Sequence, residues 1–251
     1  MKPNRKKYQL SKETLDSVLN QTSSDTELDL NSNGKKGNTF LLINPETSEL
    51  QFIIPYKFDG HFYAAHFPNP VQLFFKLAIE HKSKADIVVK SFENNVELEY
   101  SQGENSTGKI KMVNSDIFDQ FIIHKICCLT ALISTVEAFV NENIPEDLKI
   151  RNNKNVEVGK FEVERFWDLK SKLKEVIPKT VNLENETYEV LVNKFLEINY
   201  LRNEFTHMKF KTDNRNFDPY LDNFKKLINL DLDKTILEVQ KLINSIKKSY
   251  L

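Results

Sequence analysis

The sequence predicts an α+β protein, in which a small N-terminal α+β domain with β-hairpins precedes a C-terminal bundle of four to five helices. Two patterns lead to this prediction. Apolar residues between positions 39 and 113 follow the two-residue period of strands, and those in 114–251 follow the three- and four-residue spacing of helices. With 251 residues, the chain is long enough for two modest domains with a sizeable core.

Residues 1–38 are rich in Lys, Ser, Asn and Asp and end in the run Asn33-Gly34-Lys35-Lys36-Gly37. Ser11 can cap a short helix from Lys12 to Leu19, but the rest has too few apolar residues to form a core. We expect a polar arm or linker here.

Residues 39–113 are expected to form a small α+β domain whose role the sequence does not reveal. Phe40–Ile43 and Leu50–Ile54 flank the turn-forming run 44–48, which predicts a first hairpin. Asn69 and Pro70 predict the start of a helix, with Asn69 as its cap and Pro70 at its first position.

A second hairpin is predicted later in the same domain. The strand-like segments Asp86–Phe92 and Val96–Tyr100 flank Asn94-Asn95, a pair of turn-forming residues.

The helices of the C-terminal domain are predicted from their apolar stripes. Asp116–Val140 is apolar nearly all round, which indicates a helix buried on several sides. Phe161–Val176 carries apolar residues three and four apart and is expected to stop at Pro178. The next stripe, from Tyr188 to Ile198, leads directly into Arg202.

Two further helices complete the predicted bundle. Asp218-Pro219 opens a short helix, and the last helix begins at about Asp233. It carries its apolar residues on one face: Ile236, Val239, Ile243 and Ile246.

Charge and cysteine content narrow the classes of function. The net charge of -1 argues against a protein that holds nucleic acid through its overall field, so any RNA contact must be local or transient. Cys127 and Cys128 are adjacent in a predicted helix, where their side chains point about 100° apart and do not form a bridge. They are typical of small buried side chains in a reducing compartment.

We expect a cytoplasmic protein without a membrane span. The N-terminus is basic, but no apolar signal core follows it. Phe121–Val140 is the one stretch that resembles a membrane helix, and it contains His124, Lys125 and Glu137, each costly in lipid.

The segment from Arg202 to His207 carries the most informative chemistry of the chain. Only five of the 35 basic residues are arginines, so lysine is the default cation. The planar fork of an arginine can hold a phosphate through two parallel hydrogen bonds, which lysine cannot do. Histidine can both accept and donate a proton near neutral pH. A phosphate clamp and a proton shuttle are the minimum for cleaving a phosphodiester.

Leu201–His207 resembles the signature of the HEPN superfamily (higher eukaryotes and prokaryotes nucleotide-binding): an Arg, a polar residue, and a His shortly beyond. The segment Ile133–Pro145, with its embedded Glu137, also resembles that family's first helix. The resemblance covers residues from about 115 to 250. It implies a HEPN-like bundle and a metal-independent endoribonuclease, often a toxin or an antiviral (abortive-infection) effector, which works as a homodimer.

The resemblance also implies roles for individual residues. Arg202 would hold the phosphate of an RNA substrate, and His207 would act as base or acid, with His207 of the second subunit in the complementary role. Asn203 would orient the imidazole or donate to a phosphate oxygen, and Glu137 would position Arg202 or His207. The products would be a 2′,3′-cyclic phosphate and a 5′-hydroxyl. No cofactor or metal is expected, and an antitoxin or regulatory partner is a further expected partner.

Helix geometry separates the two key side chains. Asn203 and His207 are four residues apart and share one helix face, whereas Arg202 and His207 are five apart and lie about 140° apart. Either the helix ends or loosens near Thr206, or the pairing of Arg with His crosses the dimer interface.

Structural explanations compete with each catalytic assignment. Arg202 could instead form an ion pair with Glu137, Glu197 or Glu204, and His207 could bond the free carbonyls of a helix end. Glu137 could equally be a solvated or structurally paired glutamate.

The charged and histidine residues elsewhere have similar alternatives. Lys209, Lys211 and Arg215 could contact RNA phosphates, or they could form a solvated face. His61 and His66 indicate ordinary packing, because no third ligand at metal spacing accompanies them. His124 is expected to be a core or interface histidine. The competing class of function is a non-catalytic HEPN-like module that binds a nucleotide or a partner, which the near-neutral charge favours.

Overall fold

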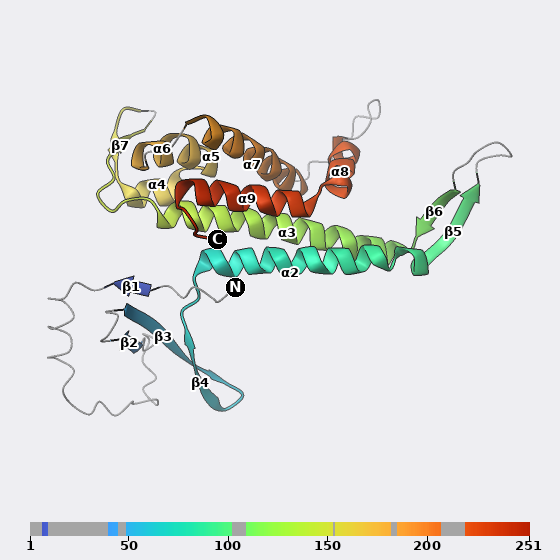
Figure 1. Cartoon of the computed structure of the whole chain (residues 1–251), viewed down its shortest axis with the longest axis horizontal. Helices are drawn as coiled ribbons and strands as arrows, with labels where there is room; N and C mark the ends of the chain where they lie inside the picture. Colours follow the sequence, from blue (N-terminus) through green and yellow to red (C-terminus); the bar gives the residue numbers. More distant parts are fainter. Residues whose placement is uncertain are drawn as a thin grey trace. The chain divides into compact units, whose positions relative to one another are not determined.

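A computed structural model describes residues 7–9, 40–44, 49–101, 109–152, 154–181, 185–206 and 219–251. The chain is mostly helical with a few short antiparallel strands, which agrees with the predicted α+β class (Figure 1). It divides into two units, Met1–Gln72 and Leu73–Leu251.

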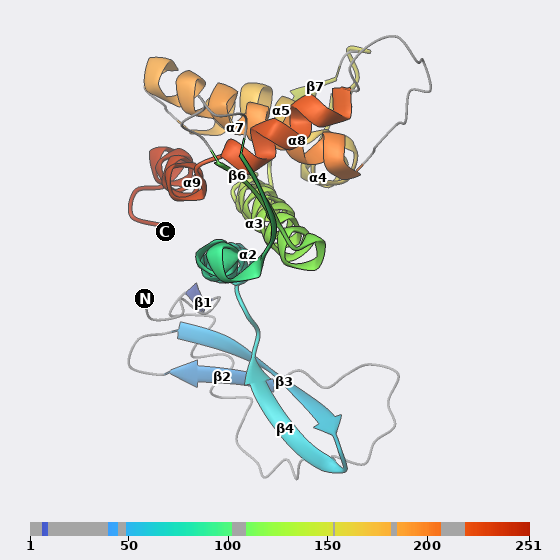
Figure 2. The same cartoon turned by 90° about the vertical axis from the view of Figure 1, so that its right-hand side faces the viewer.

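The described part of the first unit is a four-stranded antiparallel sheet. Its long strand β3 (Glu49–Phe58) pairs with β1 (Lys7–Gln9), β2 (Phe40–Asn44) and β4 (His61–His66), as Figure 2 shows. The predicted first hairpin is therefore confirmed as the pair β2–β3.

A hairpin that sequence analysis missed joins β3 to β4 through two residues. Asp59 and Gly60 have φ angles of 47° and 78°, the left-handed backbone of the tight turns that suit the twist of a hairpin. Glycine adopts this backbone without steric cost, and Asp tolerates it better than most residues. The Asp-Gly pair was the signal that could have predicted this hairpin.

Helix α2 (Pro70–Lys90) begins where the sequence predicted. The side-chain Oδ1 of Asn69 accepts a hydrogen bond of 2.9 Å from the backbone N–H of Val71. The helix then continues through residues 86–90, which had been predicted as a strand, so that part of the prediction is wrong. An ion pair of 2.8 Å between Lys82 and Asp86, one turn apart, supports the helix there.

The second predicted hairpin exists, but with a different first strand. β5 (Val96–Ser101) pairs antiparallel with β6 (Lys109–Val113), and Tyr100 lies opposite Ile110. A 3₁₀ turn, η1 (Phe92–Asn95), occupies the expected turn at Asn94-Asn95 and instead links α2 to β5.

Helix α3 (Ser115–Glu142) is the core helix of the second unit, and Asn114 caps its N-terminus. Twelve of its residues are buried, which confirms the prediction of a helix buried on several sides. Among the described residues, α3 is the one helix long and apolar enough to cross a membrane, and 56% of its apolar window is buried inside the protein. A core helix has the same length and composition.

The structure draws the boundary between its units at Gln72–Leu73, whereas sequence analysis divided the chain at 113–114. Most of α2 belongs with the helical unit because it packs along α3, where His81 contacts His124. The apolar period of the β5–β6 ribbon resembles that of the first unit, but the ribbon connects α2 to α3.

The helix predicted for residues 161–176 is broken into short pieces, so a single continuous helix was wrong. The pieces are α4 (Lys160–Phe166), α5 (Leu169–Ser171), the π-helical turn η2 (Lys172–Val176) and α6 (Ile177–Thr180). Asp168 starts a new helix by accepting a hydrogen bond of 2.8 Å from the backbone N–H of Ser171. Pro178 lies in the first turn of α6 and does not end the segment.

Helices α7 (Asn185–Thr206), α8 (Pro219–Asn229) and α9 (Leu232–Ile246) complete the second unit. α7 and α9 pack on α3 and on each other (Figures 1 and 2). The predicted last stripe is confirmed, because its members are buried: Ile236, Val239, Ile243 and Ile246.

Two further features describe the packing of this unit. A cluster of Ile144, Ile150, Val163 and Val176 lies beyond the end of α3, and Trp167 packs against it.

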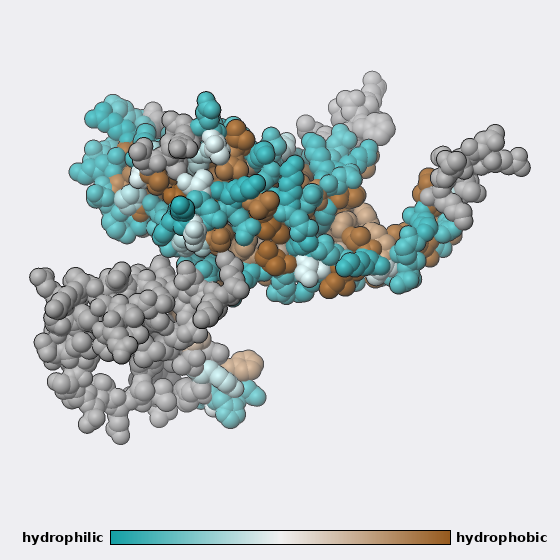
Figure 3. Space-filling model, viewed as in Figure 1, coloured by the Kyte–Doolittle hydropathy of each residue, from teal (hydrophilic) through white to brown (hydrophobic). Residues whose placement is uncertain are grey.

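The surface mixes hydrophobic and hydrophilic residues, with hydrophobic patches on the face shown in Figure 3. α2 contributes exposed apolar side chains such as Ile87, which is 63% exposed.

Candidate functional site

The last turn of α7 in the described part of the chain carries Arg202 and Asn203. His207 follows Thr206 directly in the sequence and lies outside the described residues, as do Lys209, Lys211 and Arg215. The catalytic and RNA-binding roles of these four residues therefore stay predictions.

Arg202 is half-buried, and its guanidinium is only partly satisfied. Its Nη2 donates a hydrogen bond of 3.3 Å to Oδ1 of Asn199, one turn earlier on α7. Its Nε is buried and has no hydrogen-bond acceptor within the described part of the chain. A buried donor without an acceptor costs about 1–3 kcal/mol, so this Nε–H is an unfavourable feature of the fold.

None of the carboxylates suggested as structural partners forms an ion pair with Arg202 among the described residues. Glu204 instead accepts a hydrogen bond of 3.2 Å from Asn223 of α8. Arg202 is therefore held by a neutral amide, and its positive charge is not neutralised by a described neighbour.

An aromatic cluster fixes the end of α7 against α3 and α8. The ring centroids of Phe205 and Phe224 are 6.1 Å apart, and Phe224 lies 6.1 Å from Phe118 of α3. Phe118 in turn contacts Phe121 and Phe92 at 6.2 and 6.4 Å. This packing gives the turn that carries Arg202 a defined position in the second unit.

Lys125, which sequence analysis had noted only as costly in lipid, holds the end of α8. It is 5% exposed, and its Nζ donates hydrogen bonds of 2.8, 2.6 and 2.9 Å to the carbonyls of Leu227, Ile228 and Leu230. These acceptors lie at the C-terminus of the helix, where a positive charge is favourable. Burial lowers the pKa of Lys125, although Asp231 acts in the opposite direction.

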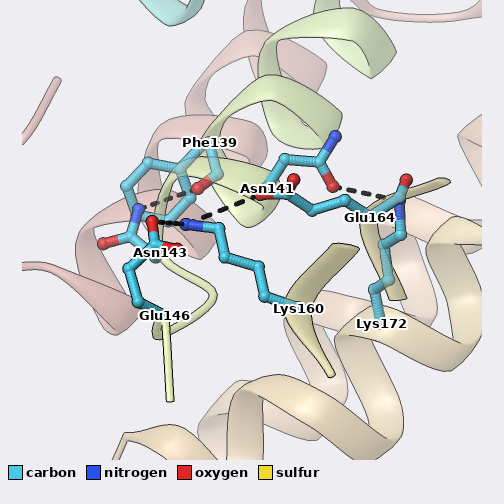
Figure 4. Close-up of polar contacts among 7 residues, drawn as sticks. All are labelled: Phe139, Asn141, Asn143, Glu146, Lys160, Glu164 and Lys172. Carbon is cyan, nitrogen blue, oxygen red and sulfur yellow. Dashed lines mark hydrogen bonds and ion pairs between the residues drawn. The ribbon is translucent and has the colours of Figure 1, made fainter. Parts of the chain in front are cut away.

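A second buried lysine, Lys172, lies at the other end of α3, as Figure 4 shows. It is 1% exposed and donates hydrogen bonds of 3.0 Å to Oδ1 of Asn141 and 2.8 Å to the carbonyl of Glu164. Burial lowers its pKa, and Glu137 and Glu164 oppose that shift. Beside it, Lys160 and Glu146 form an ion pair of 2.7 Å (Figure 4).

Glu137 thus lies in the electrostatic surroundings of Lys172. It is exposed on α3, and no hydrogen bond or ion pair joins it to Arg202 in the residues that the structure describes. The structure does not bring these two predicted site residues together.

An open groove of about 1020 Å³ lies between α7, α8 and α9, next to the turn of Arg202. An ion pair of 3.0 Å between Lys194 and Glu238 crosses it from α7 to α9. Three lysines in its lining are balanced by three carboxylates, so it lacks the excess positive charge of a phosphate track. These six residues are Lys194, Lys226, Lys234, Glu197, Asp231 and Glu238.

The histidines of the first unit and the two cysteines are the remaining candidates. His61 is exposed and makes a ring contact with Tyr63, and the side chain of His66 is not described. Both cysteines are free, and burial raises the pKa of Cys128 to about 12. Within the described ranges no group of three or more His, Cys, Asp or Glu residues could hold a metal ion.

A comparison of the chain with protein-family models, curated proteins and solved structures finds no match.

Proposed function

We propose that the protein is a metal-independent endoribonuclease of HEPN type, acting as a toxin or antiviral (abortive-infection) effector. The observation that carries this proposal is the state of Arg202. Its guanidinium is half-buried, is held by one hydrogen bond to a neutral amide, and has a buried Nε–H with no acceptor among the described residues.

These properties suit a phosphate clamp. Two unit charges 4 Å apart attract by about 4 kcal/mol at the effective dielectric constant of a protein surface. No described carboxylate forms an ion pair with Arg202, so its guanidinium can attract a phosphodiester. Asn199 holds Nη2 and thereby limits the rotation of the guanidinium plane.

The chemistry assigns one role to each sequence-predicted residue. His207 of one subunit removes the proton from the RNA 2′-OH, and the 2′-oxygen then forms a bond to phosphorus. The bond from phosphorus to the 5′-oxygen breaks, and His207 of the second subunit gives that oxygen a proton. Arg202 stabilises the charged phosphorane, and Asn203 orients the imidazole or donates to a phosphate oxygen. The products are a 2′,3′-cyclic phosphate and a 5′-hydroxyl.

A homodimer follows from the spacing of the motif. Arg202 and His207 are five residues apart, and on a continuous helix they would point about 140° apart. Pairing between two copies brings an arginine and a histidine to the same phosphate.

The test is cleavage of total RNA by the purified protein in the presence of a chelator, with analysis of the RNA ends. We expect Arg202→Lys and His207→Ala each to lower the rate by about 100- to 1000-fold, the loss seen when one charge-stabilising donor is removed. Circular dichroism establishes that each variant is folded.

Arg151→Lys is a matched control. Arg151 also donates to an asparagine amide, Oδ1 of Asn155 at 3.1 Å, but it is exposed and far from α7 in the sequence. Cleavage that needs a metal ion, or that survives Arg202→Lys, would contradict the proposal. Nucleotide binding without cleavage by the unmodified protein would favour the non-catalytic module.

A further inference from the structure

A pair of histidines interrupts the apolar seam between α2 and α3. On α2 the buried residues Phe75, Ala78 and Ala85 share one face, and His81 falls between them at the same helical spacing. His124 of α3 lies against it and is half-buried. The two Nδ1 atoms are 3.1 Å apart, and the ring centroids are 5.3 Å apart.

A neutral histidine ring has one nitrogen whose lone pair can accept a proton or bind a metal ion. A hydrogen bond between the two Nδ1 atoms needs one ring to donate its N–H and the other to accept through an unprotonated nitrogen. Neutral imidazole is the form that binds a metal ion.

We propose that His81 and His124 form a two-histidine site for a borderline divalent transition ion, Cu²⁺ or Zn²⁺. Metal–nitrogen bonds of about 2.0–2.1 Å separate two ligand atoms by about 3.3 Å in a tetrahedron and about 2.9 Å in a square plane. The observed 3.1 Å between the Nδ1 atoms lies between these values. Both side chains are half-buried, so solvent can reach them and water can complete the coordination.

The neighbouring carboxylates form ion pairs with lysines, so the two histidines are the protein ligands of the proposed site. Glu80 pairs with Lys84 at 2.6 Å. Asp86 and Asp233 both pair with Lys82, each at 2.8 Å. Mg²⁺ and Ca²⁺ prefer oxygen ligands and do not fit such a site. A bound transition ion would join α2 to α3 and stabilise the second unit.

This site goes beyond the proposed nuclease function and does not depend on it. The histidines lie on α2 and α3, whereas the proposed catalytic motif begins at Arg202, near the C-terminal end of α7. We expect RNA cleavage to continue in chelator while the ion at the histidine pair is removed, so the two proposals fail independently.

Isothermal titration of the chelator-treated full-length protein with ZnCl₂ or CuCl₂ tests the site. We expect one ion per chain at the pair, and His81→Gln and His124→Gln each to weaken binding by at least about tenfold. His61→Gln, which changes an exposed histidine of the first unit, is the matched control and should leave the affinity unchanged.

Electron paramagnetic resonance of the unmodified protein loaded with Cu²⁺ gives a test that needs no variant. We expect coupling to two imidazole nitrogens, even if a substituted protein fails to fold. Wild-type affinity in the folded His81→Gln variant, or a copper spectrum without two imidazole nitrogens, would overturn the site and leave the pair as a hydrogen bond between two rings.

Discussion

The buried lysines and Arg202 are cations in different situations. Lys125 and Lys172 are 5% and 1% exposed, and their ammonium groups donate to three and two protein oxygens. Arg202 is half-buried, has five donors, and makes one side-chain hydrogen bond to a described residue. The difference teaches that a buried cation with its donors satisfied belongs to the fold, and that one with spare donors is available to a ligand.

The geometry of the two side chains explains this division. The ammonium of Lys125 is a compact charge whose three donors match three carbonyls at the end of α8. The flat guanidinium of Arg202 spreads its donors in one plane, and Asn199 engages only one of its nitrogens.

The largest expected effect tests whether a buried lysine with satisfied donors stabilises the fold. Lys125→Met keeps the apolar stem but leaves three carbonyls at the end of α8 without their donor. We expect the free energy of unfolding to fall by about 3 kcal/mol, measured by chemical denaturation. Lys194→Met is the control, because Lys194 is half exposed and its pair with Glu238 should contribute less than about 1 kcal/mol. Equal losses in the two variants would erase the distinction between buried and exposed lysines.

A smaller expected effect tests whether Arg202 needs a neutral hydrogen-bond acceptor. Asn199→Asp replaces the neutral acceptor of Arg202 with a carboxylate, which would neutralise the guanidinium and compete with phosphate. We expect RNA cleavage to fall about tenfold, or 1.4 kcal/mol, with stability unchanged or slightly higher.

Asn193→Asp is the matched control for that prediction. Asn193 is also on α7, and its Oδ1 also accepts a hydrogen bond from a cation, Lys174 at 2.9 Å. Its substitution should leave cleavage unchanged. If both variants lose activity equally, added negative charge on α7 is the cause and the pairing with Arg202 is not.

The smallest expected effect concerns Asp168, an exposed carboxylate that accepts hydrogen bonds from Ser171. Partial burial acts to raise the pKa of Asp168, but hydrogen bonds from the backbone N–H and hydroxyl of Ser171 outweigh it and hold the pKa below 3.8. Because the folded-state pKa is the lower one, this contribution to stability is complete above about pH 4 and is lost as the pH falls through the folded-state pKa.

Asp168→Ala should therefore lower the free energy of unfolding by about 0.5–1 kcal/mol at pH 7. The difference from the unmodified protein should shrink in denaturation curves recorded below pH 4. A difference that stays constant from pH 7 to pH 2.5 would show that the ionised carboxylate is not the source of the effect.

Local patterns were enough to predict much of the fold. The cap at Asn69, the apolar surroundings of α3 and the stripe of α9 are local signals, and each element was found where expected. Residues 86–90 misled because Ile, Val and Val resemble a strand, whereas the ion pair between Lys82 and Asp86, one turn apart, supports a helix there. The break at Asp168 was missed because an apolar stripe does not show where a side chain will cap a new helix.

The candidate site was predictable only in part. The sequence placed Arg202 at the end of a helix, but it could not show which acceptors the guanidinium would meet. Lys125 and Lys172 were missed because lysine is ordinarily a surface residue, and their acceptors are backbone carbonyls and an amide distant in sequence. Glu137 was linked to Arg202 because a charge on an otherwise apolar helix face should have a partner, whereas its position on α3 brings it near Lys172.

Trp167, which packs beyond the end of α3, is the only tryptophan in the chain. Its fluorescence emission therefore reports on one place, the break between α4 and α5 and the apolar cluster beside it. Local opening at Phe205 and Phe224 would leave that emission unchanged. An emission curve that lags behind the loss of helical circular dichroism would show that helices elsewhere in the chain open before the surroundings of Trp167.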